Sequence, residues 1–285
     1  MLQREFTEEQ NMFRDAYRKF LATEIVPHME DWREAGIVDR EAFRKAGEQG
    51  FLMIWPDEKY GGLGDDDFRF EPIIIEETAY ARASDWYNSL HSRLVGPYLT
   101  RFGNEEQCQR FLPGCVTGEL ILAIAMTEPD AGSDLAGMRS TAVEHDDHWV
   151  LSGSKTYISN GINADVVIVA AKTDPENNPH HMTLFLVERG MEGFERGRNL
   201  EKMGLKAQDT AELFFNDVKV PKENVLGEPG KGFIYLMEGL AEERLMGAAG
   251  YIATAQLSWD LTAEFVKERK AFGKPLAAFQ NTQFK

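Results

Sequence analysis

The chain has 285 residues, 43% hydrophobic and 27% charged, which is enough for a large core and ordinary for a globular protein. Its formal net charge of -16 is spread along the chain without a basic block. A nucleic-acid partner is therefore not expected, because phosphate binding needs a concentrated basic surface. Another polyanion could bind only through a local basic pocket that works against the global field.

The longest apolar run, residues 164–171, is too short to span a bilayer, so no membrane span is expected. The first ten residues lack the apolar core of a secretory signal, and their acids argue against a transit peptide. Cys108 and Cys115 cannot form a disulfide framework and are interpreted as plain thiols, with a redox pair as the alternative. We expect a reducing compartment: the cytoplasm, or the mitochondrial matrix if this is a processed eukaryotic chain.

Residues 1–119 are expected to form a helical domain. Thr7 and Gln10 form a capping-box pattern, and apolar residues then recur at helical spacing until Pro27. A second helix is predicted to begin after Asp39. Further helical patterns cover residues 71–83, 87–102 and 105–112.

Residues 120–228 have the sequence pattern of a β domain. Short β-branched or aromatic segments alternate there with Gly, Asn, Asp and Pro clusters, which predicts an antiparallel barrel or sandwich and not βαβ units. The segments are residues 121–127, 139–145, 148–153, 155–159, 165–171, 182–188 and 211–217.

Residues 229–285 are expected to begin a C-terminal helical bundle that is truncated here. A long amphipathic helix starts near Gly230 and runs to Trp259 or on towards Lys270. The order helical, β, helical gives an α+β fold class.

Several motifs point away from common sites. The sequence contains neither a Gly-x-Gly-x-x-Gly fingerprint after a strand nor a P-loop, so a Rossmann-type site is not expected. His145 and His148 lie between two strand-like segments and are interpreted as a polar hairpin turn in preference to metal ligands. No metal site is assigned.

Two segments contain candidate ligand-binding residues. Residues 125–134 (AMTEPDAGSD) read as a strand that ends in a loop of hydroxyls, glycine and free N–H groups, suited to the edge of a polar heterocycle or to a phosphate. In residues 155–161 (KTYISNG), Tyr157 and Ser159 are two apart on a strand and share one face, so both can meet one ligand. Taken singly, an ordinary surface loop and an ordinary amphipathic strand explain them equally well.

With residues 203–221 (MGLKAQDTAELFFNDVKVP) and 268–283 (ERKAFGKPLAAFQNTQ), these segments resemble the acyl-CoA dehydrogenase family, in the same order and with family-like spacing. The similarity covers essentially the whole chain. Residues 204–215 and the region of Glu243 look most similar to the long-chain type. The resemblance implies an FAD flavoprotein with a helical, a β and a second helical domain.

The resemblance also implies cofactor contacts. One group would wrap the edge of the flavin ring: Ile124, Ala125, Met126, Thr127, Gly132 and Ser133, of which Ser133 would also lie near the substrate. A second group would flank the isoalloxazine, with the Ser159 hydroxyl near N5: Tyr157, Ile158 and Ser159. A third group matches residues that reach the ADP half of FAD in a neighbouring subunit, which implies a homotetramer: Arg269, Phe272 and Gln280.

In this family an α-proton leaves a thioester while the β-hydride passes to the flavin, which yields the trans-2-enoyl-CoA of fatty-acid β-oxidation. The resemblance implies an electron-transfer flavoprotein as acceptor. The base is expected to be a desolvated carboxylate. The long-chain type carries it just before an arginine, which corresponds to Glu243 and Arg244; the alternative is a helix-surface glutamate. Gly239 and Gly247, one turn away on either side, are expected to leave room for the thioester.

Substrate contacts are implied for Ser133, His180, Tyr235, Glu242 and Arg244. Glu242 leaves the helix about 100° from Glu243, so its replacement by Gln is expected to be nearly silent. Two other functions stay open at this point: a non-catalytic subunit that completes a neighbour's FAD site, and an acyl-CoA oxidase that uses dioxygen. The sequence does not specify the acyl chain length.

Overall fold

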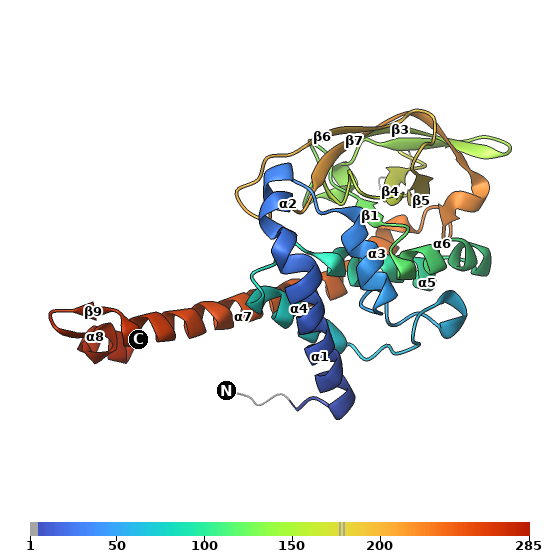
Figure 1. Ribbon diagram of the computed structural model, residues 1–285. Helices are drawn as coiled ribbons and strands as arrows, with labels where there is room; N and C mark the ends of the chain where they lie inside the picture. Colours follow the sequence, from blue (N-terminus) through green and yellow to red (C-terminus); the bar gives the residue numbers. More distant parts are fainter. Residues whose placement is uncertain (1–4, 177, 179) are drawn as a thin grey trace.

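The computed structural model describes residues 5–176, 178 and 180–285 of the chain. A helical region packs beside one β-sheet, and a single long helix projects from the body to carry the C-terminus (Figure 1). The chain therefore has the predicted α+β class. The expectation that the N-terminus is not a leader rests partly on residues 1–4, which lie outside the described residues.

Helix α1 (Glu8–Phe20) begins at the predicted capping box. Thr7 Oγ1 accepts the Gln10 N–H at 3.2 Å, and Gln10 Oε1 accepts the Thr7 N–H at 3.1 Å. The helical path does not end at Pro27. It continues through a π-helix, η1 (Leu21–Ile25), and a 3₁₀ turn, η2 (Val26–His28), into α2 (Met29–Ala35). Pro27 is tolerated because it lies in the first turn of a new helical segment, where its missing N–H has no partner to lose.

Helix α3 (Arg40–Glu48) starts after Asp39, as predicted, and the Asp39 side chain accepts the Glu41 N–H at 2.9 Å. The remaining helices of this region are α4 (Phe70–Tyr80), the π-helix η4 (Leu90–Val95), α5 (Gly96–Phe102) and α6 (Glu105–Thr117). Cys108 and Cys115 lie buried in α6 as free thiols, which confirms the plain reading.

The β domain contains eight strands within the described residues: β1 (Leu122–Ala125), β2 (Thr141–Glu144), β3 (His148–Ser159), β4 (Val166–Lys172), β5 (Met182–Glu188), β6 (Phe194–Asn199), β7 (Thr210–Pro221) and β8 (Val225–Leu226). They form one sheet in the order β6-β7-β3-β2-β4-β5-β8, with β1 beside β4. Most pairs are antiparallel, but β1 and β2 both run parallel to β4. Over the described residues the two end strands do not pair, so the sheet is not a closed barrel.

Strands β4 and β5 are covered on both faces, which explains their uninterrupted apolar sequences. Val167 and Val169 point into the cluster enclosed by the folded sheet, where Trp149 meets Phe185 at 5.5 Å between ring centroids. Ile168, between those two valines, belongs to the cluster shared with α5 and α6. A strand that is buried on both sides has no polar face, and therefore no alternation in its sequence.

Strands β6 and β8 lie outside the segments that the sequence predicted. Strand β6 has the sequence FERGRN, with one apolar residue, and pairs only with β7 at the edge of the sheet. Phe194 stacks on Phe215 at 5.1 Å, while the Arg196 guanidinium donates to the carbonyls of Gly161 and Ala164. The His145–His148 segment forms the predicted hairpin turn, closed by a 2.8 Å bond from His145 N–H to the His148 carbonyl.

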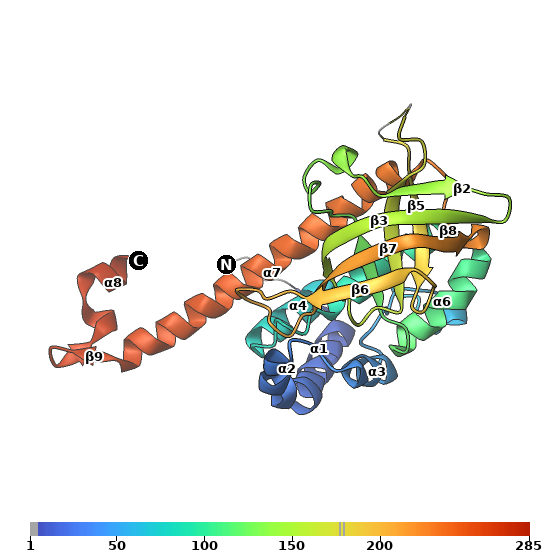
Figure 2. The ribbon, with the colours of Figure 1, turned by 90° about the horizontal axis from the view of Figure 1, so that it is seen from above.

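Helix α7 (Gly232–Glu268) is 37 residues long and extends past Trp259 towards Lys270. Its first half packs on the body, and its second half projects away with β9 (Lys270–Ala271), β10 (Lys274–Pro275) and α8 (Gln280–Phe284) at the far end (Figure 2). Large apolar side chains are exposed along it: Leu245, Tyr251, Ile252, Trp259, Leu261 and Phe265. Of the described helices, including this one, none is apolar over a stretch long enough to cross a membrane.

Candidate active site

Glu243 lies on the part of α7 that packs against the helical region. Its Oε1 atom is buried and has no hydrogen-bond partner. Burial raises the pKa of this carboxyl, while the positive charge of Arg244 and the nearby Tyr98 hydroxyl act in the opposite direction. A partly desolvated carboxylate with one oxygen left unpaired is suited to act as a general base, and the Tyr98 hydroxyl is the neighbouring donor that stabilises its charged form.

Tyr98, on α5, faces the same turn of α7. Its hydroxyl is also buried without a hydrogen-bond partner. A β-carbon added to Gly239 would lie 2.0 Å from Tyr98 Oη, so this glycine makes room for the tyrosine. The expectation that Gly239 leaves room for a thioester is corrected accordingly. Gly247, one turn beyond Glu243, does have open space beside it.

An apolar cavity of about 320 Å³ lies between α4, the segment 84–89 and α7. Its lining includes Ile74, Ile75, Ala79, Trp86, Tyr87, Leu205, Met246, Gly247 and Gly250. Met246 and Gly247, three and four residues after Glu243 on α7, line this cavity. Burial raises the pKa of Tyr87, and the charge of Glu243 raises it further. The cavity therefore offers a mostly apolar space within one helical turn of a candidate base.

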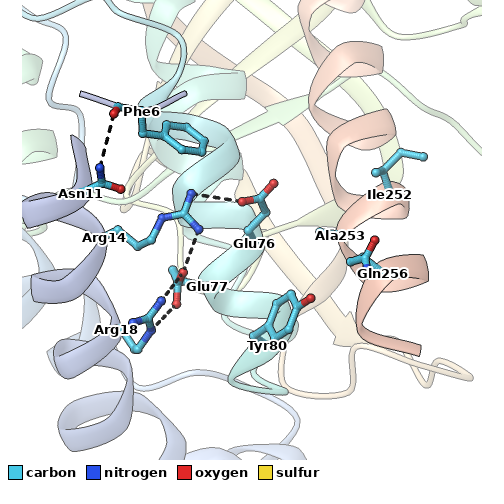
Figure 3. A pocket seen from close by; sticks show the side chains of 10 residues that line it. All are labelled: Phe6, Asn11, Arg14, Arg18, Glu76, Glu77, Tyr80, Ile252, Ala253 and Gln256. Carbon is cyan, nitrogen blue, oxygen red and sulfur yellow. Dashed lines mark hydrogen bonds and ion pairs between the residues drawn. The ribbon is translucent and has the colours of Figure 1, made fainter. Parts of the chain in front are cut away.

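A larger hollow of about 920 Å³ lies between α1, α4 and α7 (Figure 3). Its charged side chains already compensate one another: Arg14 lies 3.2 Å and Arg18 2.8 Å from the Glu77 carboxylate. The sticks of Figure 3 show these groups turned towards each other and Ile252 of α7 on the opposite wall. Because the arginines and glutamates that line this hollow pair with one another, the hollow is not assigned to the site.

Glu242 has partners of its own within the protein. Its Oε1 accepts from Arg93 Nε at 2.6 Å, and its Oε2 accepts from Arg101 Nη2. Both oxygens are thus engaged by arginines of η4 and α5, where a substrate contact was expected. Replacement by Gln would break both ion pairs, so Glu242 is not the silent position that helix geometry alone suggested.

The other residues expected to contact the substrate differ in their surroundings. Tyr235 stacks on Phe102 at 4.0 Å, and its hydroxyl accepts the Glu228 N–H at 3.2 Å, so its ring serves packing at the start of α7. His180 is exposed and borders a cleft of about 390 Å³ with Lys231. Arg244 is exposed beside Glu243.

The loop after β1 is held by a buried ion pair. Glu128 accepts the backbone N–H groups of Arg139 at 2.6 Å and Ser140 at 3.0 Å. Lys155, whose side chain is 0% exposed, donates to Glu128 Oε1 at 2.8 Å and to the Met126 carbonyl at 3.2 Å. Desolvation lowers the pKa of Lys155 to about 8, against the pull of Glu128. This pair fixes both ends of the loop against β3.

The remaining loop residues fall into two classes. Thr127 is half-buried, and Gly132 and Ser133 are exposed, so their polar groups are free to meet a ligand. Ile124 and Met126 pack partly against the helical cluster, whereas the Ala125 side chain is buried within the sheet. Ala125 could meet a cofactor only through its backbone. Asp130, at the loop tip, pairs with Arg139 at 3.0 Å.

Tyr157 combines a strained backbone with a free ring. Its φ is +59°, which is unfavourable for an aromatic residue, and its side chain is 70% exposed. A β-bulge between Lys155 and Ile158 turns it outward. Ile158 is 3% exposed within the sheet, so only its backbone could meet a ligand, while Ser159 is half-buried. Strain that presents a flat ring at the surface favours a binding role for that ring.

The two segments lie side by side, because the Thr156 N–H donates to the Thr127 carbonyl at 3.0 Å. An exposed aromatic ring and a hydroxyl-bearing loop therefore share one region. These groups suit a flat heterocycle that needs a stacking surface and hydrogen bonds at its edge.

Arg269, Phe272 and Gln280 lie elsewhere. All three are exposed at the far end of α7, with Phe272 95% exposed and at a φ of +51°. At the usual rise per residue, Arg269 lies roughly 39 Å along the helix axis from Glu243. Within one chain these residues cannot belong to the same site as Glu243.

Sequence reasoning missed Tyr98, Tyr87 and Arg93. Tyr98 and Arg93 lie in a segment that reads as one more helix, and their partners on α7 are about half the chain away. Gly239 was the available signal for Tyr98, because a glycine inside a long helix often marks a close approach by a neighbour. Arg93, one charge on an otherwise buried helix, gave a weaker signal.

Known protein families and solved structures are similar to this chain over nearly its whole length. Three family models match: "Acyl-CoA dehydrogenase, N-terminal domain" at residues 7–119, "middle domain" at 123–218 and "C-terminal domain" at 230–285. The long-chain specific acyl-CoA dehydrogenase of Sus scrofa is 48% identical over 100% of this chain, and the chain spans 66% of that relative's length. The glutaryl-CoA dehydrogenase of Desulfococcus multivorans is 38% identical, over 97% of this chain and 72% of its own.

Solved structures give the same result. The acyl-CoA dehydrogenase of Geobacillus kaustophilus superposes with a TM-score of 0.95 at 53% identity, covering 99% of this chain and 74% of its own. The butyryl-CoA dehydrogenase of Megasphaera elsdenii has a TM-score of 0.89 at 35% identity, covering 99% and 75%. The chain belongs to the acyl-CoA dehydrogenase family.

Proposed function

We propose that the protein is an FAD-dependent dehydrogenase that converts an acyl-CoA thioester to the trans-2-enoyl-CoA, with Glu243 as the base. The observation that carries this proposal is the buried, unpartnered Oε1 of Glu243, one helical turn from Met246 and Gly247, which line a mostly apolar cavity. Solved relatives support the cofactor: an acyl-CoA dehydrogenase of Bacillus anthracis is described as complexed with FAD, and a glutaryl-CoA dehydrogenase of Mycobacterium smegmatis as complexed with FADH2.

Different residues of the chain are proposed to bind the cofactor and to accept the substrate proton. FAD, when bound, supplies the acceptor for the β-hydride. Glu243 takes the α-proton, and the burial that raises its pKa makes it a stronger base than an exposed glutamate. Tyr157 would support the flat face of the cofactor. Thr127, Ser133 and Ser159, with the backbones of Ala125 and Ile158, would hold the cofactor's polar edge.

The cavity lining supports an aliphatic acyl chain as the substrate, and we place the reaction in fatty-acid β-oxidation. His180 and Arg244, which are both exposed, are assigned to the coenzyme A portion. An electron-transfer flavoprotein is the proposed acceptor. The compartment is proposed to be the cytoplasm, or the mitochondrial matrix for a processed eukaryotic chain, as for the Sus scrofa relative, whose name includes "mitochondrial".

A homotetramer is the proposed assembly. Its support is the position of Arg269, Phe272 and Gln280, exposed and remote from Glu243 in the same chain. A planar guanidinium suits a diphosphate and is not interchangeable with an ammonium group. Arg269→Lys should therefore loosen FAD more than a surface Arg→Lys change does. Light scattering that shows an active, FAD-loaded monomer would exclude the tetramer.

The test of the function uses the full-length, FAD-loaded protein and a chain-length series of acyl-CoAs. Mixed anaerobically in a stopped-flow instrument, the wild type should bleach its flavin absorbance. Glu243→Gln keeps the shape of the side chain but cannot accept a proton, so the bleaching rate should fall by about 10²–10⁴ at unchanged FAD content. The matched control is Glu238→Gln, an exposed position one turn before Glu242.

Two other functions give different results in the same experiment. A non-catalytic subunit would contribute to FAD binding, but no acyl-CoA would bleach the flavin. An acyl-CoA oxidase would bleach and then consume dioxygen rapidly on exposure to air. Bleaching at the wild-type rate by Glu243→Gln would disprove the assignment of the base.

A further inference from the structure

A partly buried ion cluster links α7 to the helical region beside the proposed base. Arg93, whose side chain is 8% exposed, donates from Nε to Glu242 at 2.6 Å and from Nη1 to Asp66 at 2.7 Å. Arg101 engages the second oxygen of Glu242 from the more exposed side. Two arginines from consecutive helical segments therefore form ion pairs with one carboxylate of α7.

The surroundings fix the Arg93 guanidinium in place. It lies 5.5 Å from the Phe68 ring centroid and 5.9 Å from the Trp55 ring, so aromatic groups flank it. Buried ion pairs of this kind add little net stability, because desolvation offsets their attraction. Their best-attested contribution is to specify one geometry.

A second acid, Glu71, lies near Arg93. Glu71, on α4, is buried, and its Oε2 has no hydrogen-bond partner. Burial raises the pKa of Glu71 to about 7, Arg93 lowers it and Glu242 raises it, so this carboxyl faces both groups. In its neutral form Glu71 does not compete with Glu242 for the guanidinium.

Glu242 directly precedes the proposed base, Glu243, in the chain. Glu242 and Glu243 leave α7 about 100° apart, so fixing one side chain against η4 and α5 fixes the direction of the other. The same face of this turn is held at a second point, where Tyr98, also on α5, occupies the space above Gly239. The two contacts together restrict rotation of this turn about the helix axis.

We infer that Glu242, through its ion pairs with Arg93 and Arg101, is a positioning residue that orients the Glu243 carboxylate towards the substrate. The inference rests on the proposed role of Glu243 as base. It assigns Glu242 no contact with the substrate, in contrast to the expectation from the sequence.

The experiment compares flavin reduction by acyl-CoA in the wild type and in Glu242→Gln, both as full-length, FAD-loaded protein. Rates are expressed per bound flavin and measured across pH. If the Glu243 carboxylate is misplaced by about 1 Å, the plateau rate of flavin reduction should fall by between about tenfold and about 10²-fold. The midpoint of the pH profile should not move, because the base itself is unchanged.

Two further variants keep the test decisive. Glu238→Gln, exposed and one turn earlier, should leave both the plateau and the midpoint unchanged. If Glu242→Gln loses its flavin, the decision passes to Arg101→Gln, a half-exposed position that removes one of the two ion pairs. It should lower the plateau several-fold at wild-type FAD content.

An unchanged plateau in these variants would overturn the inference. So would a shifted midpoint at an unchanged plateau, since Glu242 would then act through its charge and not through position. Glu243→Gln, run beside them, separates this result from a failure of the proposed function. If Glu243→Gln is inactive and Glu242→Gln is not impaired, only the positioning role is wrong.

Discussion

Tyr98 and Gly239 are in direct contact across the interface between α5 and α7. A β-carbon on Gly239 would lie 2.0 Å from the Tyr98 hydroxyl, which is closer than any non-bonded contact allows. The tyrosine therefore reaches the helix backbone one turn before the proposed base. Any side chain at position 239 must displace either the ring or the helix.

Gly239→Ala should accordingly lower the free energy of unfolding by about 1–3 kcal/mol, the usual cost of overpacking, although alanine is the better helix former. Flavin reduction should slow as well. Thermal melting and stopped-flow rates check both effects. Tyr98→Phe removes the clashing oxygen and should restore part of the loss in the double variant. Gly247→Ala, with open space beside it, should be neutral or stabilising.

Glu71 should make stability depend on pH in an unusual direction. Its folded-state pKa of about 7 lies above the value of an unfolded glutamate, so the folded chain keeps a proton that the unfolded chain releases. The free energy of unfolding should fall by about 3 kcal/mol as pH rises from about 4.3 to above 7. Glu71→Gln should remove this slope and be the more stable form at pH 8. Denaturant titrations of both proteins that run parallel across pH would contradict it.

His91 should act in nearly the same pH window with the opposite sign. Its Nδ1 accepts the Leu122 N–H at 3.1 Å, so its Nε2–H donates to the Cys115 carbonyl at 2.9 Å and the ring is neutral. Burial lowers the pKa of His91 to about 4. As pH falls from about 6.5 to 4, the unfolded chain gains a proton that the folded chain excludes, and stability falls by about 3 kcal/mol.

His91→Gln should lose this acid-side slope, although it should be less stable at neutral pH because two buried hydrogen bonds change. The exposed His180→Gln is the control. Because the contributions of His91 and Glu71 oppose each other, the wild-type curve alone shows only their difference. Each becomes visible when its variant is subtracted from the wild type.

Breaking the Lys155–Glu128 pair should disturb the cofactor loop. Lys155→Met leaves a buried carboxylate without its ammonium partner, which typically costs about 3–5 kcal/mol. The double variant with Glu128→Gln should recover part of that cost. FAD should dissociate faster from both, since Glu128 holds the loop through two backbone N–H groups. Fluorescence of released flavin measures this, with the exposed Lys219→Met as control.

The sequence predicts best those features that depend on neighbours in the chain. The Thr7–Gln10 capping box and the Asp39 N-cap are three and two residues wide, and both form as predicted. Strand β6 was missed because its pairing with β7 and its place at the sheet edge, not its own sequence, make it a strand. Edge strands carry charge for solubility, which hides the periodicity.

In the site, too, local features could be predicted and contacts with distant parts of the chain could not. Glu243 could be proposed from the sequence because of a family motif and its place on an amphipathic helix. The partners of Glu242 lie 149 and 141 residues away, so no local pattern reports them. The exposure of Tyr157 likewise depends on a bulge that strict alternation does not predict.

The length of α7 has a consequence for mixed assemblies. Under the proposed arrangement, one chain supplies Glu243 to a site and a different chain supplies Arg269, because the two lie roughly 39 Å apart on one helix. Two inactive proteins, one carrying Glu243→Gln and the other Arg269→Met, would then rescue each other when co-expressed. In each mixed pair one site would inherit both defects and the other neither, so activity would return from parents that have none.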